Sequence, residues 1–296
     1  MNAARHEPVM VDEVLSILAP GRGGTFVDCT VGLGGHAAGL LSAGVTRLIG
    51  LDRDDDALRL AGEQLAAFGD RVELVHADYR DLPAVLDARG IAAVDGILAD
   101  LGVSSLQLDS EGRGFSFRRD EALDMRMDRS QGPTAADLIA RADETDLANV
   151  IFQFGEERHS RRIARAIVRA RESASITATG ALADIVRRAV PARGHQRIDP
   201  ATRTFQALRI WVNRELEGLD TFLREAARRL ITGARFAVIS FHSLEDRTVK
   251  HTFRALAAAG DAWRVLTRKP VVPGDDEVAR NPRARSAKLR AIERVA

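Results

Sequence analysis

Short apolar runs alternate with stretches of helical spacing along the first hundred residues of the chain. The runs end at Asp28, Asp52, His76 and Asp100, and each has the length of a β-strand. Strands that alternate with helices at this spacing predict βαβ units, and hence a parallel sheet covered by helices on both faces. The predicted strands lie around 26–28 and over 47–52, 72–76 and 96–100, with helices over 11–18, from His36 onward, over 57–68 and over 82–89.

The pattern changes after Asp100. Residues 101–127 are rich in glycine and turn signals, residues 134–188 have helical spacing throughout, and residues 191–197 form a basic linker. Asp199 and Pro200 then have the order of an N-cap and a first helical residue. Apolar residues at three- and four-residue spacing predict one long helix from there to about Leu230: Phe205, Leu208, Val212, Leu216, Leu219 and Leu223.

Strand character returns at residues 234–240, and a helix is predicted over 243–259, where Ser243 and Asp246 have the spacing of a capping box. Residues 263–266 and 289–295 are expected to be antiparallel strands at one edge of the sheet. We therefore predict an α/β protein. Its discontinuous sheet domain covers residues 1–107 and 213–296, and an all-helical insertion covers residues 108–212.

The composition narrows the class of protein. At 296 residues and 45% hydrophobic residues, the chain suits one or two globular domains. No apolar run reaches the roughly 18 residues of a membrane span, and the N-terminus lacks an apolar signal segment. The single cysteine, Cys29, excludes an internal disulfide, and its place at a strand end predicts a buried, unreactive thiol. These features predict a cytoplasmic protein without membrane attachment.

The net charge of +1 conceals an uneven choice of basic residues. Nearly all of them are arginine, and the only lysines are Lys250, Lys269 and Lys288. Arginine has a planar fork that pairs with phosphate and stacks on bases. Because a genome rich in G and C also favours arginine codons, this composition is only a hint of a nucleic-acid partner.

The stretch from Thr25 to His36, TFVDCTVGLGGH, carries a strand through a glycine turn into the start of a helix. Glycine permits positive φ and lets a ligand approach the backbone, and a helix N-terminus offers unpaired N–H groups. The spacing is G-x-G-G rather than the dinucleotide pattern G-x-G-x-x-G. Taken alone, the stretch is compatible with an ordinary tight turn as well as with a small-molecule cradle.

Polar side chains at the strand ends favour the cradle, because ligands bind outside the carboxyl ends of parallel strands. Asp52 is placed to accept both hydroxyls of a ribose, and Asp78 or Tyr79 to flank an adenine. Asp100 would face the reacting end of the ligand. The set fits a dinucleotide or S-adenosyl-L-methionine, and the G-x-G-G spacing with an acid after the fourth strand favours S-adenosyl-L-methionine.

Longer sequence motifs lie along the whole chain. They are HEPVM at 6–10, DCTVGLGGH at 28–36, DLGVSS at 100–105 with Gln107, RGFSF at 113–117, LDMRMD at 123–128, FGEER at 154–158, TRTFQALRIWVN at 202–213, SFHSLEDR at 240–247 and NPRARS at 281–286. With these motifs the sequence resembles the ribosomal RNA small-subunit methyltransferase H family. Members of that family methylate the exocyclic N4 of a cytidine in the decoding region of 16S rRNA.

The resemblance implies a Rossmann-like methyltransferase sheet with an inserted helical domain, S-adenosyl-L-methionine as methyl donor, and 16S rRNA within the small ribosomal subunit as partner. Two residues depart mildly from the family pattern: Cys29 stands where glycine or alanine is expected, and Tyr79 where phenylalanine is expected. The resemblance to the family implies that the following residues surround the donor: Gly34, Gly35, His36, Asp52, Tyr79, Asp100 and Gln107.

Asp100 is the candidate catalytic residue. The cytosine N4 amine is a poor nucleophile, so the enzyme must hold it in line with the methyl group and withdraw density from its N–H bond. Asp100, or the backbone and hydroxyls of residues 101–104, lies at the strand end where such an acceptor is needed. The alternative is that Asp100 binds only the methionine amine of the donor.

A row of arginines is the first candidate for contact with RNA. Arg158, Arg162, Arg165 and Arg169 recur at spacings of four, three and four, which places them on one face of a predicted helix. They either contact phosphate or form an ordinary solvated face.

Other residues have two interpretations each. Phe115, Phe117 and Trp211 are candidates for stacking on an extruded base, and the alternative is a role in the core. His242 follows the returning strand and either orients the target base or braces its own loop.

Several functions stay open on the sequence alone: a nucleotide-dependent oxidoreductase, a non-catalytic RNA-binding module, and a methyltransferase acting on another RNA, on DNA or on protein. The histidines have no mutual ligand spacing, which predicts that no metal is bound. The oligomeric state is not specified, and a homodimer is compatible with the sequence.

Overall fold

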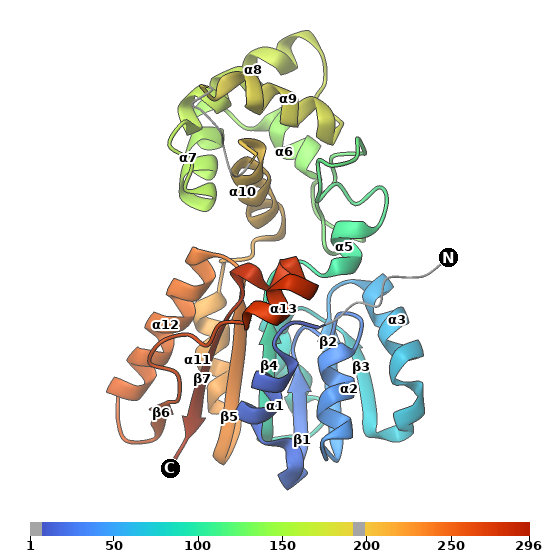
Figure 1. The fold of residues 1–296 in the computed structure, drawn as a ribbon, viewed down its shortest axis with the longest axis vertical. Helices are drawn as coiled ribbons and strands as arrows, with labels where there is room; N and C mark the ends of the chain where they lie inside the picture. The colour runs from blue at the N-terminus through green and yellow to red at the C-terminus, as the bar shows by residue number, and fades with distance from the viewer. Residues whose placement is uncertain (1–7, 192–198) are drawn as a thin grey trace. The chain divides into compact units, whose positions relative to one another are not determined.

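A computed structural model describes residues 8–191 and 199–296 (Figure 1). His6 and Glu7 of the first motif, and residues 192–197 of the predicted basic linker, lie outside this part of the chain. The chain divides into two compact units: Met1–Gly102 with Gly218–Ala296, and Val103–Glu217. We call the first the sheet unit and the second the inserted unit, and describe each by itself.

The sheet unit is built on a seven-stranded sheet in the order β3-β2-β1-β4-β5-β7-β6. The first five strands are parallel to their neighbours, and β7 is antiparallel to both β5 and β6. The α/β fold predicted from the alternating pattern, with its antiparallel pair at one edge, is therefore confirmed. The strands are β1 (Thr25–Asp28), β2 (Arg47–Asp52), β3 (Val72–His76), β4 (Val94–Asp100), β5 (Leu230–Ser240), β6 (Trp263–Val265) and β7 (Lys288–Arg294).

Alternate residues of each strand point to opposite faces of the sheet, and helices pack on the apolar residues of both faces. On β5, Ala237 and Ile239 share one buried cluster with residues of the first three helices, whereas Phe236 contacts Phe222 and Phe253 of later helices at ring-centroid distances of 5.9 and 5.7 Å. The α-helices of the unit are α1 (Val11–Leu18), α2 (Gly35–Ser42), α3 (Asp55–Leu65), α4 (Leu82–Asp87), α11 (Leu219–Arg228), α12 (Ser243–Ala258) and α13 (Asp275–Arg280).

The inserted unit has its own hydrophobic core, formed by the inward faces of its helices. Ile151, Ile163 and Ile167 are fully buried in it, and Leu123 and Met125 of the preceding loop join them. The helices are α5 (Ser105–Asp109), α6 (Ala135–Arg141), α7 (Glu144–Gly155), α8 (Ser160–Ser173), α9 (Thr179–Ala189) and α10 (Ala201–Asn213).

The single long helix predicted from residue 201 to about Leu230 is wrong. α10 ends at Asn213, Arg214 has φ of 51°, and α11 begins only at Leu219 after Gly218. Across this turn, Arg209 forms two hydrogen bonds with Glu215, of 2.8 and 2.7 Å. In a continuous helix, residues six apart lie on different faces and do not meet.

The start of α12 also differs from the prediction. The N-cap is His242, not Ser243, and the side chain of His242 accepts the Glu245 N–H. Asp246 does not complete a capping box; it pairs with Arg290 at 2.6 Å and with Lys288 at 3.4 Å.

Candidate functional site

The strand ends that carry acids are adjacent in the sheet. β1 lies between β2 and β4, so Asp28, Asp52 and Asp100, the last residues of these strands, line one edge. The chain leaves β1 toward β2 on one side and β4 lies on the other, which makes this the switch point where ligands bind in open α/β sheets.

The glycine turn after β1 is held by hydrogen bonds from its backbone N–H groups. The Gly32 N–H donates to Asp52 Oδ2 at 2.9 Å, and the Gly34 N–H donates to Val31 O at 2.7 Å. Gly34 has φ of 85°, a conformation that favours glycine. A Cβ on Gly35 would lie 2.8 Å from Pro8, so this glycine allows the N-terminal segment to approach α2.

Asp52 ends β2 and orders the turn. Its Oδ1 accepts the Asp54 N–H at 3.0 Å, and its Oδ2 accepts the Gly32 N–H. Burial raises the pKa of Asp52, although both hydrogen bonds oppose that shift. Each carboxylate oxygen has a second lone pair, so Asp52 can still accept two hydroxyl groups of a ligand.

Asp28 is the functional candidate that the sequence interpretation passed over. It is 1% exposed; Oδ1 accepts the Thr30 N–H at 3.1 Å, and Oδ2 is buried with no hydrogen-bond partner in the described part of the chain. Burial, with a smaller contribution from the charge of Asp52, raises the pKa of Asp28 to about 7 against the opposing bond from Thr30. The signal available in the sequence was an acid at the last position of a buried strand.

Asp100 is in a similar position at the end of β4. Its N–H donates to Thr30 Oγ1 at 2.6 Å, and its Oδ1 is buried with no partner among residues 8–191 and 199–296. Burial raises the pKa of Asp100 well above its usual range, and the charges of Asp28 and Glu245 add to that effect. Buried polar atoms without partners are rare in folded proteins because they cost free energy.

Two such carboxyl oxygens on neighbouring strands fit a ligand that brings positive charge and N–H donors. S-adenosyl-L-methionine has both, in its sulfonium and its α-ammonium group. The residues present at this edge therefore fit the donor, and Asp28 and Asp100 are the two that would hold its charged end.

His36, in the first turn of α2, is fixed by its surroundings. Its Nε2 lies 2.8 Å from the carbonyl oxygen of Val9, which only accepts, so Nε2 carries the proton. Its Nδ1 lies 3.8 Å from Asp100 Oδ2. His36 thus links the N-terminal segment to the strand end, and is 7% exposed.

Tyr79 and Asp78 follow β3. Tyr79 is 9% exposed and packs on Phe222 with ring centroids 4.6 Å apart. Asp78 pairs with Arg80 at 2.7 Å and Arg53 at 3.5 Å; burial alone would raise its pKa, but these arginines lower it. Asp78 therefore braces its turn, which leaves Tyr79 as the residue of this pair that can present a flat face.

Gln107 belongs to the inserted unit. It forms a capping box at the start of α5: Ser104 Oγ accepts the Gln107 N–H at 3.2 Å, and Gln107 Oε1 accepts the Ser104 N–H at 3.1 Å. Its local geometry is that of a helix cap, and its predicted role toward the donor stays a proposal.

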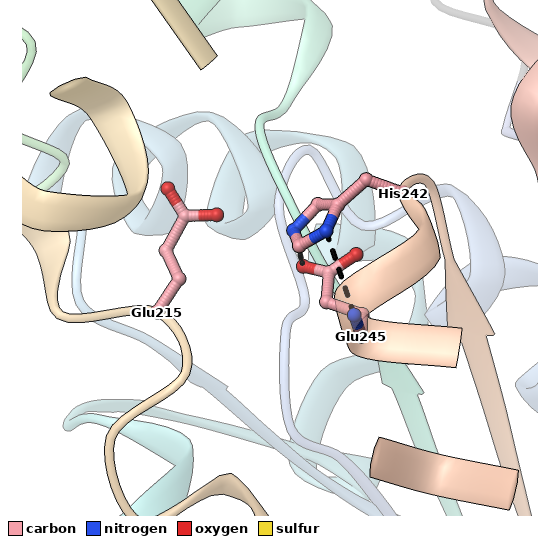
Figure 2. A group of neighbouring side chains, drawn as sticks. All are labelled: Glu215, His242 and Glu245. Carbon is pink, nitrogen blue, oxygen red and sulfur yellow. Dashed lines mark hydrogen bonds and ion pairs between the residues drawn. The ribbon is translucent and has the colours of Figure 1, made fainter. Parts of the chain in front are cut away.

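The side chain of His242 caps the start of α12 in its own loop (Figure 2), and its predicted role toward the target base stays a prediction. Its Nδ1 accepts the Glu245 N–H at 3.4 Å, so the proton lies on Nε2, which is 3.2 Å from Glu245 Oε1. Glu245 Oε2 in turn accepts the Phe241 N–H at 3.1 Å. Glu215, also labelled in Figure 2, belongs to the inserted unit, where its partner is Arg209.

The three aromatic candidates are parts of the core of the inserted unit. Phe115 is buried, Phe117 packs on Phe205 with centroids 4.8 Å apart, and Trp211 is partly buried against the same cluster. Cys29 in the sheet unit is 1% exposed, which confirms the prediction that it is buried, and burial raises the pKa of its thiol.

The predicted row of arginines is only partly on one helix. Arg162, Arg165 and Arg169 are exposed on α8, whereas Arg158 precedes the first residue of that helix, Ser160. In the described part of the chain, none of the helices is long and apolar enough to cross a membrane.

The sheet with its five parallel strands, the glycine turn at the switch point and the acids at three strand ends fit an S-adenosyl-L-methionine-dependent methyltransferase. Residues 3–295 match the MraW methylase family, and the chain belongs to that family. The resemblance to the small-subunit methyltransferase H family is therefore confirmed.

Curated relatives carry the match over nearly the whole chain. A protein of Nitrobacter hamburgensis, named ribosomal RNA small subunit methyltransferase H, is 52% identical and covers 99% of this chain and 91% of its own. A protein of Pelobacter propionicus with the same name is 50% identical over 100% of both. A solved putative methyltransferase from Streptococcus mutans in complex with SAH is 12% identical with a TM-score of 0.42, over 96% of this chain and 95% of that chain.

Proposed function

We propose that this protein transfers the methyl group of S-adenosyl-L-methionine to the exocyclic N4 of a cytidine in the decoding region of 16S rRNA. The observation that carries the proposal is identity of 50–52% over 99–100% of the chain with relatives named for the small-subunit rRNA. The substrate is the rRNA within the small ribosomal subunit, and the site of action is the cytoplasm.

The residues at the sheet edge divide the work of holding the donor. Asp52 accepts the ribose hydroxyls, and Tyr79 packs beside the adenine. Gly34 and Gly35 keep the turn narrow, and His36 fixes the approach of Asp100. Asp28 and Asp100 hold the ammonium group. This cation favours the ionised form of both carboxyl groups, because a nearby positive charge lowers the pKa of an acid.

Bound S-adenosyl-L-methionine supplies an electrophilic methyl group on a sulfonium. The chain's task is then to position N4 in line with that methyl group and to accept a hydrogen bond from the N4 amine as the new bond forms. Asp100 is the proposed acceptor, because it is the acid at the end of β4 and its carboxyl group has a second oxygen, Oδ2, besides the Oδ1 that faces the ammonium group. The proton lost from N4 leaves after methylation, when the nitrogen has become acidic.

The test is methyl transfer from radiolabelled S-adenosyl-L-methionine to purified 30S subunits that lack endogenous methylation at this site. Digestion and chromatography should place the label in N4-methylcytidine. Label in another nucleoside would retain the methyltransferase and remove the proposed substrate atom. Donor binding without label in any subunit preparation or in free 16S rRNA would contradict the proposed substrate.

A further inference from the structure

A second polar feature lies in the inserted unit, where α8 packs on α9. A surface hollow of about 530 Å³ opens between these helices. Arg162, Arg165 and Arg169 of α8 and Arg188 of α9 line it, and alanines with Ile185 form the rest of its wall. The fourth arginine of the hollow is therefore Arg188 from the neighbouring helix, and not Arg158 as the sequence spacing predicted.

The arginines of the hollow are poorly neutralised. The side chains of Arg162, Arg169 and Arg188 are exposed, and their guanidinium groups have no ion pair or hydrogen bond with any residue in 8–191 or 199–296. Arg165 has one partner, Glu144 at 3.3 Å, and both of these side chains are about half exposed.

Neighbouring arginines on the same two helices behave differently. Arg187, next to Arg188, pairs with Asp184 at 3.0 Å and with Asp199 at 2.9 Å. Arg171 donates to the carbonyl oxygens of Ile139 and Ala142 at the end of α6. Arg187 and Arg171 are thus engaged with other parts of the chain, whereas Arg162, Arg169 and Arg188 keep their guanidinium donors available.

We propose that this hollow binds a single-stranded segment of the RNA substrate, with phosphates on the four guanidinium groups and one nucleoside on the apolar wall. The proposal rests on the proposed function for the nature of the substrate. Guanidinium forks match phosphate oxygens in a bidentate geometry. The apolar wall suits an unstacked nucleoside better than a bare anion, and unstacked nucleotides occur in single-stranded RNA.

The dimensions favour a chain of phosphates over one phosphate group. Arg162 and Arg169 are seven residues apart on α8, which corresponds to about 10 Å along a helix axis. Arg188 faces them from α9. A ligand that contacts all of them must extend along the hollow, as a nucleic-acid strand does.

The test compares two double variants with the same change in charge. Arg162→Gln/Arg188→Gln removes two arginines of the hollow, and Arg118→Gln/Arg141→Gln removes two exposed arginines of the same unit that do not line it. The probe is a fluorescein-labelled single-stranded RNA, titrated by anisotropy across a series of salt concentrations. Circular dichroism and thermal midpoints check that both variants are folded.

The hollow variant should bind the RNA at least about tenfold more weakly, since two charge-assisted contacts are lost. Its plot of log affinity against log salt should be shallower by about 1.4, at about 0.7 for each phosphate contact in a single strand. The control variant should keep the wild-type slope. Equal losses in both variants, or an unchanged slope in the hollow variant, would overturn the proposal.

Two further measurements separate this proposal from its alternatives. Inorganic polyphosphate that competes as well as RNA at equal phosphate concentration would show a general polyanion site and overturn the assignment to RNA. In methyl transfer to 30S subunits, the hollow variant should raise KM with kcat and donor affinity unchanged. Because wild-type labelling tests the proposed function by itself, a normal KM in the variant would reject the hollow and leave that function intact.

Discussion

The substitution Asp28→Asn should make the donor-free protein more stable at pH 8. Asp28 is fully buried, and burial raises its pKa from 3.8 to about 7. A group with a raised pKa in the folded state keeps its proton longer there than in the unfolded chain, so ionisation of Asp28 opposes folding as the pH rises between about 4 and 7. Asparagine has the same shape, keeps an oxygen for the Thr30 N–H and does not ionise.

The size of the effect follows from the two pKa values. Each tenfold change in an acid dissociation constant corresponds to about 1.4 kcal/mol. The raised pKa of Asp28 thus lowers the free energy of unfolding by about 4 kcal/mol at pH 8. At pH 5 it lowers that free energy by about 2 kcal/mol, because Asp28 of the unfolded chain is already ionised at that pH. The stability gained by the variant should therefore increase by about 2–3 kcal/mol from pH 5 to pH 8.

The assay is urea denaturation of both proteins without donor, followed by circular dichroism at several pH values. Asp246→Asn is the matched control. Burial alone would raise the pKa of Asp246, but Arg290 and Lys288 lower it, so its carboxylate stabilises the fold above pH 4 and the substitution should lose stability. A stability difference for Asp28→Asn that does not change between pH 5 and 8 would refute the reasoning.

Three other substitutions have definite expectations. Asp100→Ala should abolish turnover, and a near-normal single-turnover rate at saturating donor would remove Asp100 from catalysis. Asn213→Ala should destabilise the protein by about 3 kcal/mol in urea denaturation, since it leaves the Met125 carbonyl and the Met127 N–H without the bonds of 2.7 and 2.8 Å that Asn213 provides. His242→Ala should lose about 1 kcal/mol and His242→Asn much less, because asparagine keeps the N-cap acceptor; methylation by both variants should stay near wild type.

The fold of the sheet unit could be predicted because its local signals agree. Apolar runs of strand length alternate with helices, three of the first four runs end in an acid, and the glycines of the turn have the positive φ that glycine permits. For the same reason, Asp52 and Asp100 were found at the strand ends where the sequence put them.

The break between α10 and α11 could not be predicted from periodicity. The apolar stripe from Phe205 to Leu223 keeps its spacing across the turn, so the pattern alone favours a continuous helix. What ends α10 is tertiary: Asn213 bonds to the backbone of Met125 and Met127, which lie more than 80 residues earlier in the chain. Single-sequence patterns carry no information about such distant partners.

The hollow illustrates the same limit for a candidate site. Spacing on one helix identified Arg162, Arg165 and Arg169 and added Arg158, because a stripe is extrapolated along its own helix. Arg188 could not be found in this way, since its place beside α8 depends on how α9 packs. Its neighbour Arg187 is paired with two acids, which the sequence does not distinguish from an available donor.

Asp28 and Asp100 each have a buried carboxyl oxygen without a hydrogen-bond partner in the described part of the sheet unit, which departs from the rule that buried polar atoms are paired. A neutral side chain at either strand end would make the donor-free protein more stable, which is the reason for the gain expected from Asp28→Asn. A cation at this edge reverses the balance, because it favours the ionised acids that burial disfavours. It follows that donor binding below about pH 7 should release protons from these acids, and that donor affinity should rise with pH in the wild type and less in the Asp28→Asn variant.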